Sequence, residues 1–208
     1  LRPSTYHGVT TVVMGNCGVG FSPCKPNQRD WLIGLMEGVE DIPGTALHEG
    51  IDWEWESFPE YLDALEKKPL AIDVGTQIPH GAVRAYVMGE RGINHEEASE
   101  DEINKMKEIV REAVEAGAYG FSTSRTEKHN DVNGKLTPSI TAHKTELVEI
   151  AKSLGEIDKG VLQGISDFYD FESEFDIFKS MSKESGRPIS ITVEQQDARP
   201  DWWIQLLD

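Results

Sequence analysis

Short apolar runs alternate along the chain with longer segments of helical periodicity. The first run, residues 9–14, is rich in β-branched side chains and predicts a strand buried on both faces. Gly15 and Gly18 bracket a tight turn at the carboxyl end of this strand, and the turn presents Asn16 and Cys17. We take this stretch as the organising element, because α/β enzymes build their sites at the carboxyl ends of buried strands.

The same alternation continues along the rest of the chain. Further strands are predicted over residues 70–78, 118–124, 160–165 and 188–193. Helices are predicted over residues 99–116, 141–154 and 172–185, and another begins near residue 201. Regular strand–helix alternation indicates a mostly parallel sheet with right-handed crossovers. The predicted fold class is α/β with about five parallel strands, either part of a (β/α) barrel or a smaller open sheet.

Residues 18–69 interrupt this pattern and predict a long irregular insertion, because they are rich in glycine, proline, tryptophan and acidic residues. Within the insertion, Ser57 and Glu60 form a capping box that begins a short helix through Leu65. A loop of this length is either a lid or binding loop, or a surface excursion around a small satellite core. The sequence leaves both interpretations open.

Composition narrows the class of partner. The chain has 20 basic and 37 acidic residues and a net charge of -17, which argues against nucleic acid and anionic membranes. No apolar run has the length of a membrane span, and no signal peptide begins the chain. The two cysteines, Cys17 and Cys24, do not make a disulfide framework, so we expect a reducing, cytoplasmic setting.

Polar side chains follow each predicted strand, and parallel strands bring such ends to one face of the sheet. These residues are Asn16, Cys17, Gln77, His80, Ser122, Thr123, Ser124, Arg125, His129, Gln163, Ser166, Asp167, Glu194, Gln195 and Gln196. Zinc accepts cysteine and histidine together and makes bound water nucleophilic near neutral pH. Plainer explanations exist: buried cysteine is more often a small apolar residue, His80 can cap a turn, and the serines suit ordinary hydrogen bonding at a strand end.

Three stretches resemble one known family. Residues 7–24 (HGVTTVVMGNCGVGFSPC), 50–62 (GIDWEWESFPEYL) and 117–126 (GAYGFSTSRT) are similar to the N-acyl-D-amino-acid deacylases, or D-aminoacylases, of the amidohydrolase superfamily. The resemblance implies a metal-dependent hydrolase on a distorted β/α barrel, with a small β-sandwich built from both termini. It also implies zinc at the strand ends, a metal-bound hydroxide that attacks an amide carbonyl, and a small N-acyl amino acid or related amide as substrate.

The resemblance, together with the polar strand ends, assigns roles to single residues. Cys17 is expected to be a metal ligand. His80, Ser124 and Arg125 are expected to be substrate-binding residues, and the planar fork of Arg125 suits a substrate carboxylate.

The chain also departs from the family. Two further ligand histidines are expected on the strands within residues 161–166 and 189–195, and neither stretch contains one. The His-x-His pair, the last-strand aspartate and the β-sandwich segments of the family would lie before Leu1 or after Asp208. We therefore expect an incomplete barrel from a divergent member, inactive alone and able to self-associate through open sheet edges.

Two other hypotheses remain. One is a degenerate barrel that acts as a binding or structural protein. The other is a thiol-based function of Cys17 and Cys24, which requires reactive thiols.

Overall fold

The computed structural model describes residues 2–194 and 197–207. The helices are α1 (Arg2–Tyr6), α2 (Arg29–Glu40), α3 (Gly44–Gly50), α4 (Phe58–Glu66), α5 (His80–Met88), α6 (Glu90–Ile93), α7 (Glu100–Ala116), α8 (Lys144–Glu156), α9 (Phe171–Ser185) and α10 (Trp202–Leu207). The strands are β1 (Thr11–Met14), β2 (Asp73–Thr76), β3 (Ile78–Pro79), β4 (Gly120–Arg125), β5 (Val161–Ser166) and β6 (Ile189–Thr192). Short 3-10 turns cover Asn16–Gly18, Pro26–Gln28 and Pro138–Thr141.

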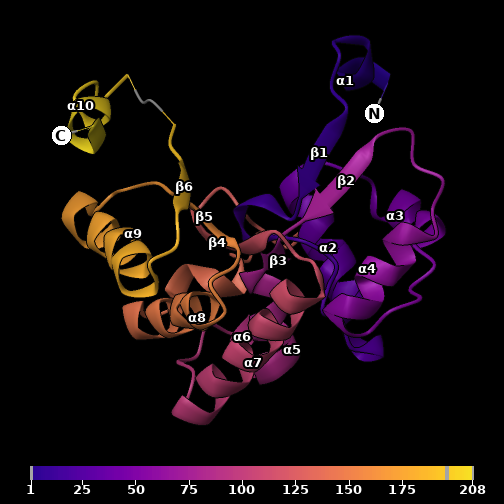
Figure 1. Ribbon diagram of the computed structural model, residues 1–208, viewed down its shortest axis with the longest axis horizontal. Helices are drawn as coiled ribbons and strands as arrows, with labels where there is room; N and C mark the ends of the chain where they lie inside the picture. The colour runs from indigo at the N-terminus through magenta and orange to yellow at the C-terminus, as the bar shows by residue number, and fades with distance from the viewer. Residues whose placement is uncertain (1, 195–196, 208) are drawn as a thin grey trace.

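All described strands pair in parallel. β1 pairs with β2, and β3, β4, β5 and β6 pair in that order. The predicted single strand over residues 70–78 is thus divided at Gln77 into β2 and β3. The Gln77 amide donates to the Met14 carbonyl over 2.9 Å, and the Tyr119 amide donates to the Thr76 carbonyl over 2.8 Å, so the two parts form one continuous layer. The described strands do not close on themselves, and the prediction of a partial β/α barrel is confirmed (Figure 1).

The main core lies between the sheet and helices α5, α7, α8 and α9, which lie together below the strands in Figure 1. Phe121 and Leu162 enter it from the strands, and Leu147 and Phe178 enter it from the helices. Predicted helix ends with local signals are confirmed: Ser99 and Glu102 form a capping box at the start of α7, and Gly117 ends that helix. These caps and apolar faces are encoded within a few residues, which is why the sequence predicts them correctly.

The prediction that residues 18–69 are mostly irregular is wrong in its central part, because helices α2 and α3 lie there. Gly34 and Gly38 lower the helix propensity of α2, and for Gly38 the structure shows a tertiary reason. A Cβ on Gly38 would lie 2.2 Å from the Asn130 carbonyl oxygen, so α2 can pack this closely only at glycine. The capping box of Ser57 and Glu60 at α4 is confirmed.

Two further expectations are corrected. The sequence pattern predicts no element between residues 78 and 99, but helix α5 begins at His80. β1 is not buried on both faces: Thr11 is exposed and Val13 is 47% exposed. β1 pairs with β2 alone among the described strands, so much of its surface is uncovered.

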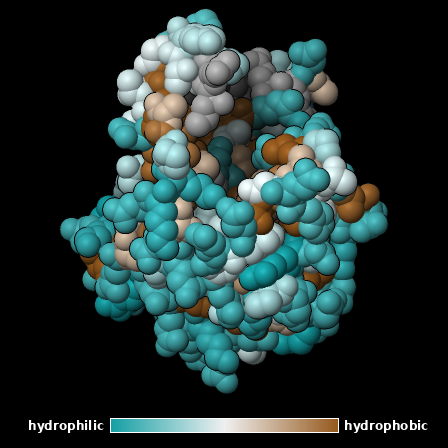
Figure 2. Space-filling view, turned by 90° about the vertical axis from the view of Figure 1, so that its right-hand side faces the viewer, coloured by the Kyte–Doolittle hydropathy of each residue, from teal (hydrophilic) through white to brown (hydrophobic). Residues whose placement is uncertain are grey.

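Figure 2 shows one face that is mostly hydrophilic, with hydrophobic residues gathered around a hollow in its upper part. No helix within the described ranges is both long and apolar enough to span a bilayer.

The turn after β1 packs against the end of β4. Its backbone has positive φ at Gly15, Cys17 and Gly18. The Gly18 amide donates to Ser122 Oγ over 3.0 Å, and a Cβ on Gly18 would lie 2.6 Å from the Ser124 backbone nitrogen. A side chain at Gly18 would therefore push the turn off the strand.

Gly18→Ala should destabilise the fold more than Gly134→Ala, which is a matched control. Both glycines have φ near the left-handed region, +74° and +81°, so both variants carry about 1–2 kcal/mol of backbone strain. Only Gly18→Ala adds a backbone clash, of about 1–3 kcal/mol, because nothing lies within 4 Å of a Cβ on Gly134. Urea denaturation measures both free energies of unfolding, and equal losses would contradict the close packing of the turn.

Candidate functional site

The Cys17 thiol lies where the ends of three strands meet. The Cys17 backbone amide donates to Gln163 Oε1 on β5 over 2.7 Å, and Asn16 Nδ2 donates to Cys17 Sγ over 3.4 Å. Gln163 Nε2 lies 4.0 Å from the same sulfur and donates to Thr192 Oγ1 on β6 over 3.3 Å. The predicted convergence of polar strand ends is confirmed for Asn16, Cys17 and Gln163, and Thr192 joins them without having been predicted.

The environment of Cys17 favours the protonated thiol. Burial raises the pKa of Cys17, hydrogen bonds with Thr192 and Gln163 lower it, and the negative charge of Glu40 raises it. Burial also raises the pKa of Cys24 to about 12, and its side chain is fully buried. Neither cysteine is in a disulfide. Since thiolates are the reactive species, this environment argues against a thiol-based function.

The donor set around Cys17 does not fit zinc. Zinc sites use three or four cysteine, histidine or carboxylate ligands. In residues 2–194 and 197–207 no group of three or more such side chains is placed to hold a metal ion. Gln163 and Thr192, on the two strands where the resemblance predicts histidines, offer an amide and a hydroxyl instead. Cys17 as a metal ligand stays a prediction.

His80 lies in the interior at the start of α5, not in an open pocket. Its Nδ1 hydrogen-bonds with Thr123 Oγ1 over 2.9 Å, and its Nε2 hydrogen-bonds with Glu146 Oε1 over 2.8 Å. Arg84 Nε lies 3.0 Å from the same Glu146 oxygen. All of these side chains are buried. The geometry gives His80 a supporting role behind the strands, and a direct contact with substrate remains only a prediction.

The rest of the Arg84 guanidinium is also bound. Its Nη2 donates to the Glu96 carbonyl over 2.8 Å, and its Nη1 donates to the Pro138 carbonyl. Sequence reasoning missed both Arg84 and Glu146. One signal was present: Glu146 precedes Ile150 and Leu154 at intervals of four, which places it on the inward face of α8.

Ser124 and Arg125 are held separately from His80. The buried Ser124 hydroxyl hydrogen-bonds with His129 Nδ1 over 2.8 Å. Arg125 makes the bidentate contact that the sequence assigns to a substrate carboxylate, but its partner is Glu174 on α9, at 2.6 and 2.7 Å. A substrate-binding role for Ser124 and Arg125 stays a prediction. The residues Gln195 and Gln196, expected at the end of β6, lie outside the described residues.

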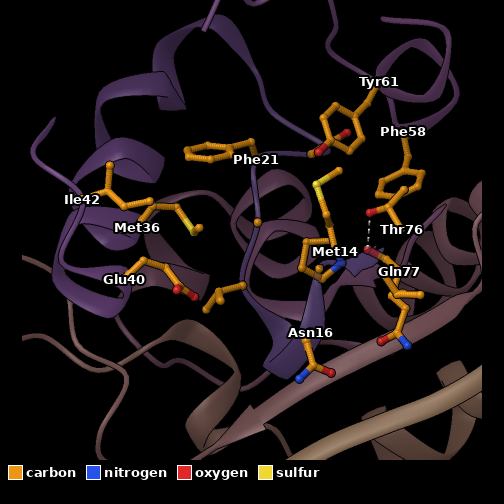
Figure 3. A pocket seen from close by; sticks show the side chains of 16 residues that line it. Met14, Asn16, Phe21, Met36, Glu40, Ile42, Phe58, Tyr61, Thr76 and Gln77 are labelled. Carbon is orange, nitrogen blue, oxygen red and sulfur yellow. Dashed lines mark hydrogen bonds between the residues drawn. The ribbon is translucent and has the colours of Figure 1, made fainter. Parts of the chain in front are cut away.

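A cavity of about 340 Å³ lies beside the Cys17 turn, between β1, β2, α2 and α4 (Figure 3). Most of the lining is apolar, and Asn16, Glu40, Thr76 and Gln77 bring polar groups to it. Sequence patterns do not predict this cavity, because helix α2, which forms part of its wall, lies in a stretch that they predict to be irregular.

Glu146→Ala should lower the free energy of unfolding by about 3–5 kcal/mol, because it leaves the Arg84 charge buried without its partner. The double variant Arg84→Met, Glu146→Leu should lose less free energy of unfolding than Arg84→Met and Glu146→Leu lose in sum. Asp176→Ala is a matched control, since its pair with Lys144 is largely exposed and contributes about 0–1 kcal/mol. Urea denaturation measures these free energies of unfolding, and additive losses would rule out a coupled buried pair.

Stability should fall as the pH drops below about 6.5. Burial lowers the pKa of both His80 and His129 from their usual value of 6.5. The folded rings therefore stay neutral while the unfolded chain takes up protons, so the free energy of unfolding decreases from pH 6.5 toward the lower folded pKa values. His129→Asn should reduce the slope of the free energy of unfolding against pH between pH 7.5 and 5.5. An unchanged slope would show that His129 does not contribute.

Comparisons with known proteins agree on one family. A profile described as "Amidohydrolase family" matches residues 1–208. The D-aminoacylase of Alcaligenes xylosoxydans xylosoxydans is 30% identical over 154 residues, which are 74% of this chain and 27% of that protein. The N-acyl-D-aspartate deacylase of the same organism is 28% identical over 155 residues, 74% of this chain and 26% of that protein.

Solved structures support the fold. A crystal structure of D-aminoacylase has a TM-score of 0.71 at 24% identity, over 99% of this chain and 39% of that chain. The N-acyl-D-glutamate deacylase from Bordetella bronchiseptica, complexed with zinc and a phosphonate inhibitor, has a TM-score of 0.69 at 22% identity, over 100% of this chain and 40% of that chain. This chain thus spans about a quarter of the length of these curated relatives. With the profile match over all 208 residues, the chain belongs to the amidohydrolase family.

Proposed function

We propose that the protein hydrolyses a carbon–nitrogen bond, other than a peptide bond, in an N-acyl amino acid or a related small amide. The observation that carries this proposal is the match to the amidohydrolase family over residues 1–208. The relatives named D-aminoacylase and N-acyl-D-aspartate deacylase support an N-acyl amino acid as the substrate class.

The residues of the chain support a site for such an amide at the carboxyl ends of the strands. Gln163 holds the backbone of the Cys17 turn, and Asn16 donates to the Cys17 sulfur. In this proposal the turn presents its amide and thiol groups to the substrate amide. The proposal gives a supporting role to three further residues, His80, Ser124 and Arg125. Their polar atoms already bond to neighbouring protein groups, so they position the strand ends and do not contact the substrate.

The related structures raise the question of a metal. One D-aminoacylase structure is reported with a binuclear metal centre, and the Bordetella bronchiseptica deacylase is reported with zinc. Zinc would supply a nucleophilic hydroxide near neutral pH. The described donors around Cys17 do not fit zinc, so we assign no step of the reaction to a metal. Cys17 is proposed as a ligand only on the strength of the family resemblance.

Because the chain alone is expected to be inactive, the test is an assay of a longer protein that contains these residues. It is given N-acetyl-D-amino acids and their L enantiomers, with and without added zinc, and release of the free amino acid is measured. Cys17→Ala should reduce turnover by about 10–100-fold or more. Cys24→Ala is the matched control, because the second cysteine is fully buried and lies outside the strand-end site. Loss of turnover only in Cys24→Ala, or no turnover with any of these amides, would refute the proposed function.

A degenerate barrel that binds rather than hydrolyses is the second candidate. The observation in its favour is that the described residues hold no group of three metal-ligating side chains. Elemental analysis of the purified protein separates the two. No bound transition metal together with no turnover would favour the binding protein, and turnover would exclude it.

A further inference from the structure

The cavity beside the Cys17 turn has an apolar wall and a polar base. Figure 3 shows Met14, Tyr61 and Phe58 on one side of it and Phe21, Met36 and Ile42 on the other. Its volume of about 340 Å³ lies within the range of about 300–1,000 Å³ that is typical of pockets for small molecules. Apolar walls of this kind bind hydrocarbon, since transfer of methylene groups out of water is favourable.

An unpartnered acceptor lies at the polar end of the cavity. Gln77 Oε1 is buried and has no hydrogen-bond partner among the described residues. Buried acceptors of this kind are rare and disfavoured when they stay unbonded. An N–H group of a ligand would satisfy the Gln77 oxygen. The same end is lined by Asn16, which donates to Cys17 Sγ and so connects the cavity to the strand-end site.

Charge sets the orientation of a ligand. Glu40 is the charged residue that lines the cavity, and the lining includes no lysine, arginine or histidine. The Glu40 side chain is exposed, and its negative charge also acts on Cys17. A ligand carboxylate inside the cavity would face Glu40 without a cation to compensate. An acyl chain inside and the carboxylate outside, toward solvent, avoids this repulsion.

We propose that this cavity binds the acyl chain of an N-acyl substrate, with the amide N–H donated to Gln77 Oε1 and the amide carbonyl directed toward the Cys17 turn. The inference deepens the proposed function and rests on it for the amide group of the ligand. It makes acyl length, rather than the amino acid side chain, the feature that this part of the site selects. The substrate class is a medium-chain N-acyl amino acid.

Equilibrium binding tests the inference without any turnover. The probes are N-acetyl-, N-butanoyl-, N-hexanoyl- and N-octanoyl-glycinamide, which are neutral, and N-octanoyl-glycine, which carries a carboxylate. Isothermal titration should show affinity rising by about fourfold per added methylene until the cavity is full. N-octanoyl-glycine should bind about as tightly as its amide, because its carboxylate lies outside the cavity, and Glu40→Gln should leave both affinities unchanged.

Variants locate the binding. Met36→Trp fills the cavity and should abolish the dependence on chain length. Leu70→Trp is the matched control, because it makes the same kind of change at an exposed apolar residue outside the cavity lining. Gln77→Leu should weaken the binding of the amide probes while keeping the dependence on chain length. Circular dichroism at rising temperature checks that each variant is folded.

A measurement on the unmodified protein covers the case in which Met36→Trp does not fold. An N-acyl-glycinamide with a diazirine near the end of its chain should label Met36 or Tyr61 after irradiation, as found by mass spectrometry. Labelling elsewhere, or affinity independent of chain length, would overturn the inference. So would the absence of saturable binding, which is the result expected if another segment or a second copy of the chain fills the cavity.

The inference and the proposed function fail in different ways. Binding that depends on chain length in a protein that releases no amino acid contradicts the hydrolase and leaves the acyl site in place. Hydrolysis with no preference for chain length contradicts the acyl site and leaves the hydrolase in place.

Discussion

The close approach of the Asn16–Gly18 turn to the end of β4 is the contact on which the rest of the site depends. A glycine at residue 18 lets the backbone come against Ser124, and the Ser122 hydroxyl bonds the Gly18 amide. Ser122 also donates to the Gly15 carbonyl, so both ends of the turn are held by one side chain. Cys17 is placed above β5 by this arrangement and not by its own side chain, which makes only weak contacts.

Features encoded within a few residues could be predicted from the sequence. The caps at Ser57 and Ser99, the apolar faces of α7 to α9 and the parallel alternation all follow from local patterns. Helix α2 is harder to predict, because Gly38 lowers its helix propensity. That glycine is needed only for the close approach to Asn130, far along the chain. The burial expected of β1 failed for a similar reason, since β-branched composition does not specify which neighbours a strand will have.

The sequence predicts where the site lies better than it predicts the hydrogen-bond partners of the residues in it. Parallel strands bring their carboxyl ends together, so the meeting of Cys17 with Gln163 and Thr192 follows from the fold class. The partners of His80 and Arg125 do not follow, because Glu146 and Glu174 lie 66 and 49 residues away on helices whose rotation the sequence specifies only coarsely. A charged side chain on an amphipathic helix is usually solvated, and these two carboxylates are the exceptions.

The buried guanidinium of Arg84 joins parts of the chain that would otherwise open independently. It starts from α5, pairs with Glu146 on α8 and donates to the carbonyl groups of Glu96 and Pro138 in two separate connections. Any local opening that separates one of these segments leaves a charge or a carbonyl group without its partner in the interior. Fraying of α5 alone is therefore disfavoured, and we expect the amides of α5 and α8 to exchange together as one cooperative unit. The residues that line the cavity beside β1 include none of these partners, so opening or reshaping that cavity leaves the contacts of Arg84 intact.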